Sequence, residues 1–143
     1  LGTRKTLLSF SVIIYAPKFS RNTVIKRLRM AKSYKQINQD QRQFGSAYRK
    51  ESPDTMNAFL ALHKAAMVDG AVSIKHKELI ATGIAIAVRC DGCIGSHVAA
   101  ALKAGATKQE LVETFDVAVL MGGGPAVIYG TQALAAVEEL SAE

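Results

Sequence analysis

The fold is decided by residues 73–105, which read SIKHKELIATGIAIAVRCDGCIGSHVAAALKAG. The stretch that follows Ser73 is apolar on almost every side of a helix, which predicts a helix at the centre of the domain or of an oligomer. A second helix is predicted to begin near Asp91 and to end at Gly105, since glycine commonly stops a helix. Two successive helical patterns without strand alternation indicate a helical protein.

Helix signals continue upstream of this stretch. Ser52, Pro53 and Asp54 supply an N-cap hydroxyl, a proline for the first helical position and a first-turn acid, so a helix is expected to start there. Residues 32–50 are polar, with few apolar anchors. They predict either a surface helix or a pair of turns interrupted at Gly45.

Downstream of the stretch, the chain holds two further helix signals. Thr107 and Glu110 form a capping box, which starts a helix expected over residues 108–121. Three glycines at 122–124 break the chain, and a last helix is expected over residues 125–140. No strand pattern follows residue 30, so the sequence predicts an all-α fold, a compact bundle of about five to six helices.

The 143 residues are enough for one domain with a hydrophobic core, and the charge is unevenly spread along them. Residues 1–29 hold seven basic side chains and no acidic one, whereas the remainder holds 11 basic and 12 acidic residues. We predict a basic and apolar leader at 1–29 and a single helical domain at 30–143. Because the domain itself is nearly neutral and aromatic residues are only 6%, no nucleic-acid partner is expected.

Three interpretations of the leader stay open. Its positive start followed by about ten apolar residues outlines a targeting segment, either secretory or, because it is arginine-rich, an organelle transit peptide. It could instead be sequence upstream of a natural start at Met30, which the abrupt change of charge at that point favours. The third interpretation is an ordered extension of the fold.

Composition excludes other classes of protein. Apolar residues make up 49% and charged residues 21%, as in ordinary folded domains. No apolar run approaches the roughly 18 residues of a membrane span, and two cysteines cannot build a disulfide-rich secreted scaffold. We expect a cytoplasmic protein without a membrane partner. The alanine-rich later helices permit close helix contacts and favour a homo-oligomer.

The pattern Cys90-x-x-Cys93-x-x-x-His97 is the one cluster that carries chemistry. Its spacing brings the two sulfurs within disulfide reach, which dithiol redox centres exploit. If a helix begins near Asp91, Cys93 lies in its first turn, where free N–H groups and the helix dipole stabilise a thiolate. His97 lies one turn later on the same face and can exchange a proton with Cys93. Two thiols that close reversibly are the equipment of a disulfide or peroxide reductase.

Two other interpretations of the cysteines stay open. They could be small buried apolar residues, or could hold a structural zinc with His97 and a fourth ligand from His63 or His76. Without a second Cys-x-x-Cys pair, neither a metal site nor a cofactor is predicted.

Whether Glu78 can contact the cysteines is less clear from the spacing, because it lies twelve residues before Cys90, which is about 18 Å of helical rise. It cannot reach the thiols along its own helix. It is either a first-turn acid favoured by the helix dipole, or the partner of a buried group contacted across helices.

These motifs together resemble a known family. The stretch Lys77-Glu78-Leu79-Ile80, the spacing Glu-x11-Cys-x2-Cys-x3-His and the run Ala101-Leu102-x-Ala104-Gly105-Ala106-Thr107 are similar to the alkylhydroperoxidase D-like branch of the carboxymuconolactone decarboxylase family. The resemblance extends from about Met56 to Leu140. It implies an all-helical fold that assembles as trimers or hexamers.

The resemblance also implies a thiol-dependent peroxidase or disulfide oxidoreductase, re-reduced by a thiol protein or a small thiol. By position, Cys93 would attack the hydroperoxide and Cys90 would resolve the resulting sulfenic acid, while His97 and Glu78 would form the proton relay. Some family members carry a second histidine between the cysteines, where this chain has Asp91 and Gly92. The alternative functions are a decarboxylase or lactone-type enzyme of the same fold, and a non-catalytic helical assembly protein with a structural cysteine pair or zinc.

Overall fold

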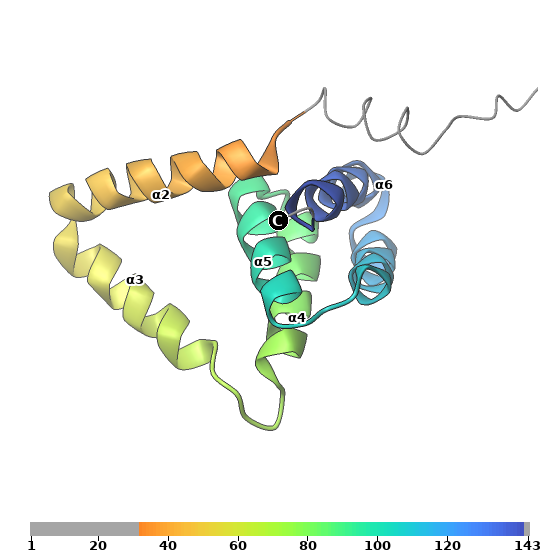
Figure 1. The fold of residues 1–143 in the computed structure, drawn as a ribbon, viewed down its shortest axis with the longest axis horizontal. Coiled ribbons are helices and arrows are strands. Elements are labelled where there is room, and N and C mark those ends of the chain that lie inside the picture. Colours follow the sequence, from red (N-terminus) through yellow and green to blue (C-terminus); the bar gives the residue numbers. More distant parts are fainter. Residues whose placement is uncertain (1–31, 142–143) are drawn as a thin grey trace, which may run out of the picture.

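The computed structural model describes residues 32–141 and builds them from helices alone (Figure 1). In chain order the elements are α2 (Tyr34–Glu51), α3 (Pro53–Ala66), α4 (Ile74–Ala87), α5 (Asp91–Lys103) and α6 (Lys108–Leu140). The all-α prediction is confirmed. Of the two alternatives for residues 32–50, the continuous helix is the one observed, and Gly45 does not interrupt it. The predicted leader at 1–29 lies outside the described residues.

The link between α4 and α5 consists of residues 88–90 alone. The N–H groups of Arg89 and Cys90 donate to the carbonyls of Ile86 and Ala85 at 3.1 and 3.0 Å, which is a Schellman ending for α4. Arg89 occupies the left-handed position of that motif, with φ 62°. Cys90, the residue that completes the ending of α4, is also the N-cap of α5. The first cysteine is therefore fixed by hydrogen bonds of two helices.

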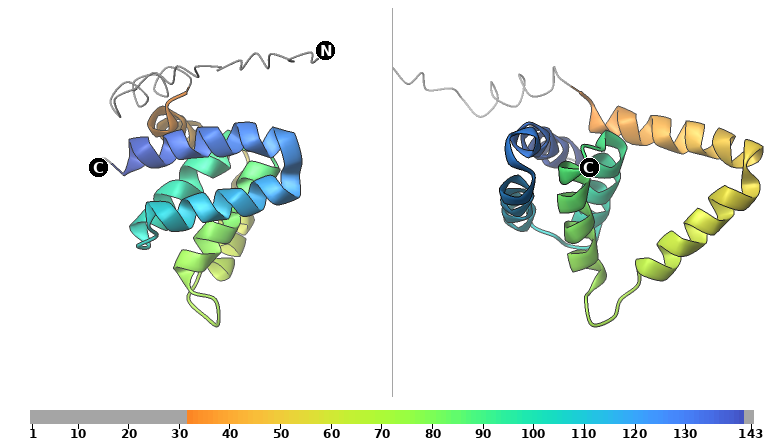
Figure 2. Two further views of the ribbon diagram at one scale, coloured as in Figure 1. Left: turned by 90° about the vertical axis from the view of Figure 1, so that its right-hand side faces the viewer. Right: turned by 180° about the vertical axis from the view of Figure 1, so that it is seen from behind.

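The last helix is bent at the predicted break. Gly123 has φ 63° and ψ −152°, which is outside the helical region, although helical hydrogen bonding continues on either side. Figure 2 shows the two halves of α6 folding back on each other beside α4 and α5. The glycine run thus turns one long apolar segment into a helical hairpin, because glycine adopts a positive φ without steric cost.

The core lies where α4, α5 and α6 meet. Its members have almost no exposed surface and include Ile86, Ile94, Val98, Leu111, Phe115, Ala133 and Val137. From the other side α2 contributes Tyr34, which is 1% exposed. A side chain at Gly95 would collide with α2, since a Cβ there would lie 2.6 Å from Asn38 Oδ1. Gly95 therefore lets α2 approach the first turns of α5.

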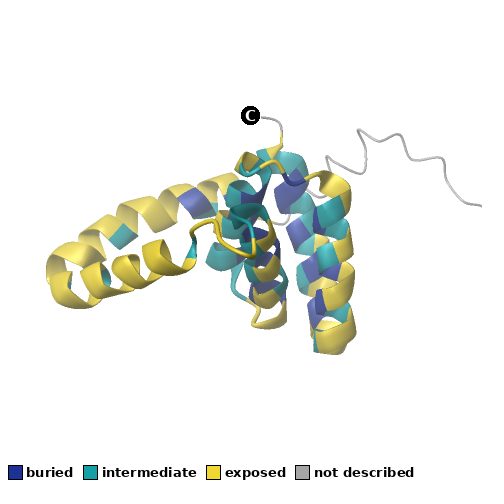
Figure 3. Cartoon of the chain, turned by 90° about the horizontal axis from the view of Figure 1, so that it is seen from below, coloured by how far each residue is buried: buried dark blue, intermediate teal, exposed yellow. Residues whose placement is uncertain are grey.

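Many large apolar side chains are exposed in the single chain. Figure 3 shows exposed residues along most of the helix pair α2 and α3, which extends away from the other helices. The helix α3 has no buried residue, although Phe59, Leu60 and Leu62 lie on it. On α4, whose sequence predicts burial on nearly all sides, Ile80, Ile84 and Val88 are 55%, 57% and 64% exposed. Only the face of α4 toward α5 and α6 is covered within the chain. A covering partner for the outer face of this helix stays a prediction.

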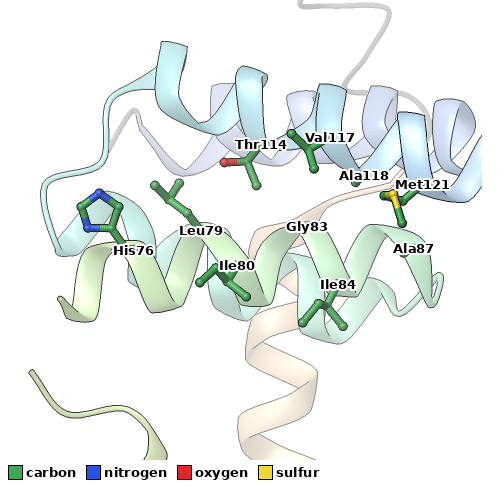
Figure 4. Close-up of a pocket in the computed structure, with 10 residues that line it drawn as sticks. All are labelled: His76, Leu79, Ile80, Gly83, Ile84, Ala87, Thr114, Val117, Ala118 and Met121. Carbon is green, nitrogen blue, oxygen red and sulfur yellow. The ribbon is translucent and has the colours of Figure 1, made fainter. Parts of the chain in front are cut away.

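Between α4 and α6 runs an apolar groove of about 480 Å³ (Figure 4). It is lined mainly by aliphatic side chains, with His76 at one end and Met121 at the other.

Within the described residues, α6 is the one helix long and apolar enough to cross a membrane by length and composition. Only 22% of its most apolar window is buried. The bend at Gly123 divides that helix into two shorter segments.

Candidate functional site

Cys90 and Cys93 are joined by a disulfide at the start of α5, with their Cα atoms 5.2 Å apart. The backbone N–H of Cys93 donates to Sγ of Cys90 at 3.2 Å, so the N-cap of the helix is itself a cysteine sulfur. Cys93 lies in the first turn, as predicted, where unpaired N–H groups concentrate positive potential. On reduction, this position favours a thiolate at Cys93.

Glu78 contacts His97 across the helix pair. The carboxylate oxygen Oε2 of Glu78 lies 2.7 Å from Nδ1 of His97. The side chain of Glu78 is 7% exposed and that of His97 is 23% exposed, so the bond is shielded from water on most sides. Of the two interpretations of Glu78, the structure therefore favours the buried partner over the simple first-turn acid. The proton-relay role assigned to the pair remains a prediction.

The contact fixes the chemistry of the imidazole. With Nδ1 bound to a carboxylate, Nε2 is the nitrogen free to exchange a proton with a neighbouring group. His97 follows Cys93 by one helical turn on the same face of α5. The carboxylate, the imidazole and the dithiol thus lie on two packed helices, with the imidazole one helical turn after Cys93.

The turn that holds the cysteines is also anchored from α2. Asp91, the residue between N-cap and Gly92, accepts hydrogen bonds from Lys32 Nζ at 2.8 Å and from the Tyr34 hydroxyl at 3.2 Å. Burial, and then the charge of Asp91, raise the pKa of Tyr34 well above its usual range, so the hydroxyl stays a donor. These contacts hold the first residue of α5 on the side of the helix opposite Cys93.

A second histidine lies close to the site. The ring of His63, an exposed residue of α3, is stacked on the ring of His97 with centroids 6.5 Å apart and planes inclined by 25°. The other histidine, His76, instead hydrogen bonds with Ser73 Oγ at 2.7 Å and lines the α4–α6 groove. For the zinc alternative, no group of three or more candidate metal ligands occurs among residues 32–141.

Sequence reasoning found four of these side chains and missed others. The cysteine spacing and the residue one turn later are visible in the sequence, and Glu78 entered through the family resemblance. His63 was counted as a surface residue or a candidate zinc ligand, and nothing in its spacing connects it with His97. Tyr34 is recognisable in the sequence as one of the apolar anchors of residues 32–50, but the contacts of Lys32 and Tyr34 with Asp91 are not, because contacts across 57 or more positions leave no periodic signal.

The fold and the site together define a helical protein with a Cys-x-x-Cys pair at a helix start and a Glu–His pair beside it. Residues 53–139 match the family model of the carboxymuconolactone decarboxylase family. The chain belongs to this family, as the resemblance predicted.

Individual relatives agree with that membership. An uncharacterized protein of Cupriavidus necator is 41% identical over 101 residues, which cover 71% of this chain and 88% of that protein. A protein of the cox locus of Paracoccus denitrificans is 39% identical over 84 residues, covering 59% of this chain and 76% of that protein.

Solved structures have the same fold. A carboxymuconolactone decarboxylase family protein from Legionella pneumophila superimposes with a TM-score of 0.73 at 45% identity, covering 76% of this chain and 96% of that one. A family protein from Thermotoga maritima, for which an involvement in the antioxidative response has been suggested, gives a TM-score of 0.61 at 27% identity. Its match covers 70% of this chain and 91% of that one.

Proposed function

We propose that the protein is a thiol-dependent peroxidase, a disulfide oxidoreductase whose Cys90–Cys93 pair reduces hydroperoxides. The observation that carries the proposal is the 2.7 Å contact between the Glu78 carboxylate and the His97 imidazole, on a helix that begins with the Cys90–Cys93 pair and carries His97 one turn after Cys93. The suggested antioxidative involvement of the Thermotoga maritima relative supports the same chemistry.

The reaction proceeds in two steps. In the first, His97 accepts the proton of the Cys93 thiol, and the thiolate attacks the terminal oxygen of the hydroperoxide; an S–O bond forms and the O–O bond breaks. The alkoxide that leaves takes up one proton, which balances the proton accepted by His97, so the products are a sulfenic acid at Cys93 and an alcohol. In the second step Cys90 attacks that sulfur, so the disulfide forms and water leaves with the Cys90 proton.

Glu78 stabilises the protonated state of His97 that the first step creates. A carboxylate bonded to an imidazolium forms a charge-assisted hydrogen bond, which is stronger than the bond to the neutral ring. Because Glu78 is nearly buried, the interaction is weakly screened by solvent. The dithiol is restored by a thiol protein or a small thiol, which a cytoplasmic setting supplies.

We propose that the active form is a homo-oligomer, a trimer or a hexamer. The exposed apolar side chains of α3 and α4 and the apolar groove between α4 and α6 support this proposal, because grouped apolar side chains at a surface are typical of interaction sites. Covering these surfaces with other copies would bury the outer face of α4.

The function is tested by mixing pre-reduced protein with tert-butyl hydroperoxide and measuring both peroxide consumption and free thiols. We expect one equivalent of peroxide to be consumed for each Cys90–Cys93 pair, with loss of two thiols. Cys93→Ser should abolish consumption, whereas Cys90→Ser should still consume one equivalent and stop at the sulfenic acid, which dimedone traps. A Cys93→Ser protein that consumes peroxide as fast as the parent would exclude this function.

The same preparation separates the alternatives. Decarboxylase or lactone chemistry would survive alkylation of both thiols, whereas the proposed reaction would not. A structural clamp would be indicated by a reduction potential below about −300 mV, since a working dithiol lies closer to the cytosolic poise.

A further inference from the structure

The end of α3 is tied to the residue that precedes Glu78. Nζ of Lys77 donates to the backbone carbonyls of Ala66 and Val68, at 2.9 and 2.7 Å. The N–H of Met67 donates to the carbonyl of His63 at 2.9 Å, so the last turn of α3 keeps its helical hydrogen bonding up to the residues that Lys77 contacts. The Lys77 side chain therefore links the end of α3, which carries His63, to the first turn of α4, although α3 has no buried side chain of its own.

With the end of α3 linked to α4 by Lys77, a second imidazole, that of His63, lies close to His97. The centroid distance of 6.5 Å between His63 and His97 lies within the range of stacked rings. Glu78 occupies Nδ1 of His97, so the stacking adds to that hydrogen bond and does not replace it. His63 is exposed and His97 is partly buried, so His63 lies on the solvent side of the pair.

The proposed reaction requires a proton donor for the leaving oxygen, and the Glu78–His97 pair is not well suited to that task. When the O–O bond of an alkyl hydroperoxide breaks, the leaving alkoxide is strongly basic and requires a proton. His97 has just accepted the Cys93 proton, and because the bonded carboxylate stabilises the protonated ring, His97 gives that proton up more slowly than an imidazole that faces solvent. A separate donor with access to solvent would supply the leaving oxygen directly.

Resting on the function proposed above, we propose that His63 is a further catalytic residue, the general acid that protonates the leaving oxygen of the hydroperoxide. The Cys93 sulfur forms the S–O bond, the O–O bond breaks, and the alkoxide takes the proton of the His63 imidazolium to leave as an alcohol. His97, which holds the Cys93 proton, returns it through water to His63. Protons and electrons balance without any further reactant.

The test compares reagents that differ in whether their leaving group needs a proton. Pre-reduced protein is mixed in single-turnover experiments with tert-butyl hydroperoxide, which releases an alkoxide, and with peracetic acid, which releases the weakly basic acetate. Iodoacetamide releases iodide, which needs no proton, and so measures the reactivity of the thiolate without any contribution from protonation of the leaving group. The variants are His63→Gln and, as a matched control on another exposed histidine, His76→Gln.

For His63→Gln we expect a fall on the order of 100-fold with tert-butyl hydroperoxide, the usual contribution of a general acid. The rates with peracetic acid and iodoacetamide should stay within about twofold, and His76→Gln should match the parent with all three reagents. Equal losses with all three reagents would assign His63 a structural role and overturn the proposal, as would an unchanged rate with the hydroperoxide. A parent protein that is alkylated normally but reacts with neither peroxide would overturn the proposed function itself, and this role with it.

Discussion

Replacing Glu78 by glutamine should slow the oxidation of the reduced Cys90–Cys93 pair by a hydroperoxide without unfolding the protein. A hydrogen bond to a charged group contributes about 1.5–3 kcal/mol, roughly twice that of a neutral bond. The 2.7 Å contact with His97 is mostly shielded from water, so the full range applies. An amide oxygen keeps about half of this interaction and loses about 0.75–1.5 kcal/mol, which corresponds to a rate about four- to thirteenfold lower.

The Glu78→Gln substitution should change the free energy of unfolding less than it changes the rate of oxidation. Glutamine fills the same space as Glu78, and a neutral His97 leaves no unpaired charge in the interior. Removal of the carboxylate also removes its desolvation penalty, which offsets the lost attraction. We therefore expect the free energy of unfolding to change by less than about 1 kcal/mol.

The assay is the single-turnover oxidation of pre-reduced Glu78→Gln protein by tert-butyl hydroperoxide, with thermal unfolding measured on the same sample. The control is Glu113→Gln, an exposed acid of α6 whose hydrogen bond comes from Gln109. It should react at the parent rate. If Glu78→Gln oxidises at the parent rate while His97→Gln is slow, the carboxylate does not assist the imidazole and the reasoning fails.

Three further predictions concern folding and assembly. Arg89→Gly should stabilise the protein by about 0.5–1 kcal/mol in denaturant unfolding, because glycine relieves the left-handed strain at φ 62° and loses part of the gain to backbone entropy; a lower stability would contradict this. The hydrogen bond from Lys75, and then that from the Thr107 N–H, lower the pKa of Glu110 to about 2. The stabilisation is complete above the ordinary pKa of about 4.5 and is lost as pH falls toward 2, so Glu110→Gln should melt below the parent at pH 6 and with it at pH 2. Ile84→Arg should shift the protein toward monomer in size-exclusion chromatography with light scattering at unchanged helix content, and an unaltered mass would exclude this face of α4 from the interface.

Local signals in the sequence were sufficient for the helices and for the start of the site. The capping box at Thr107 is present as predicted, with Thr107 Oγ1 and the Glu110 carboxylate both bonded. The glycines near residue 123 produce the predicted break, as a bend within α6. These outcomes follow from contacts only three or four residues apart, which spacing alone specifies.

Burial of α4 was less well predicted, for a physical reason. An all-apolar helix signals that every side has a covering partner, but a single sequence does not say whether the partner is the same chain. Ile84 is exposed in the chain because α5 and α6 cover only the opposite side.

From the sequence alone came the helical class, the cysteine pair at a helix start and an imidazole one turn beyond it, since each depends on neighbours along the chain. Only the tertiary structure decided which groups face that imidazole. Glu78 reaches His97 by the packing of α4 on α5, and His63 reaches it because Lys77 holds the end of α3. Such contacts depend on how helices align side by side, and helical periodicity carries no information about that alignment.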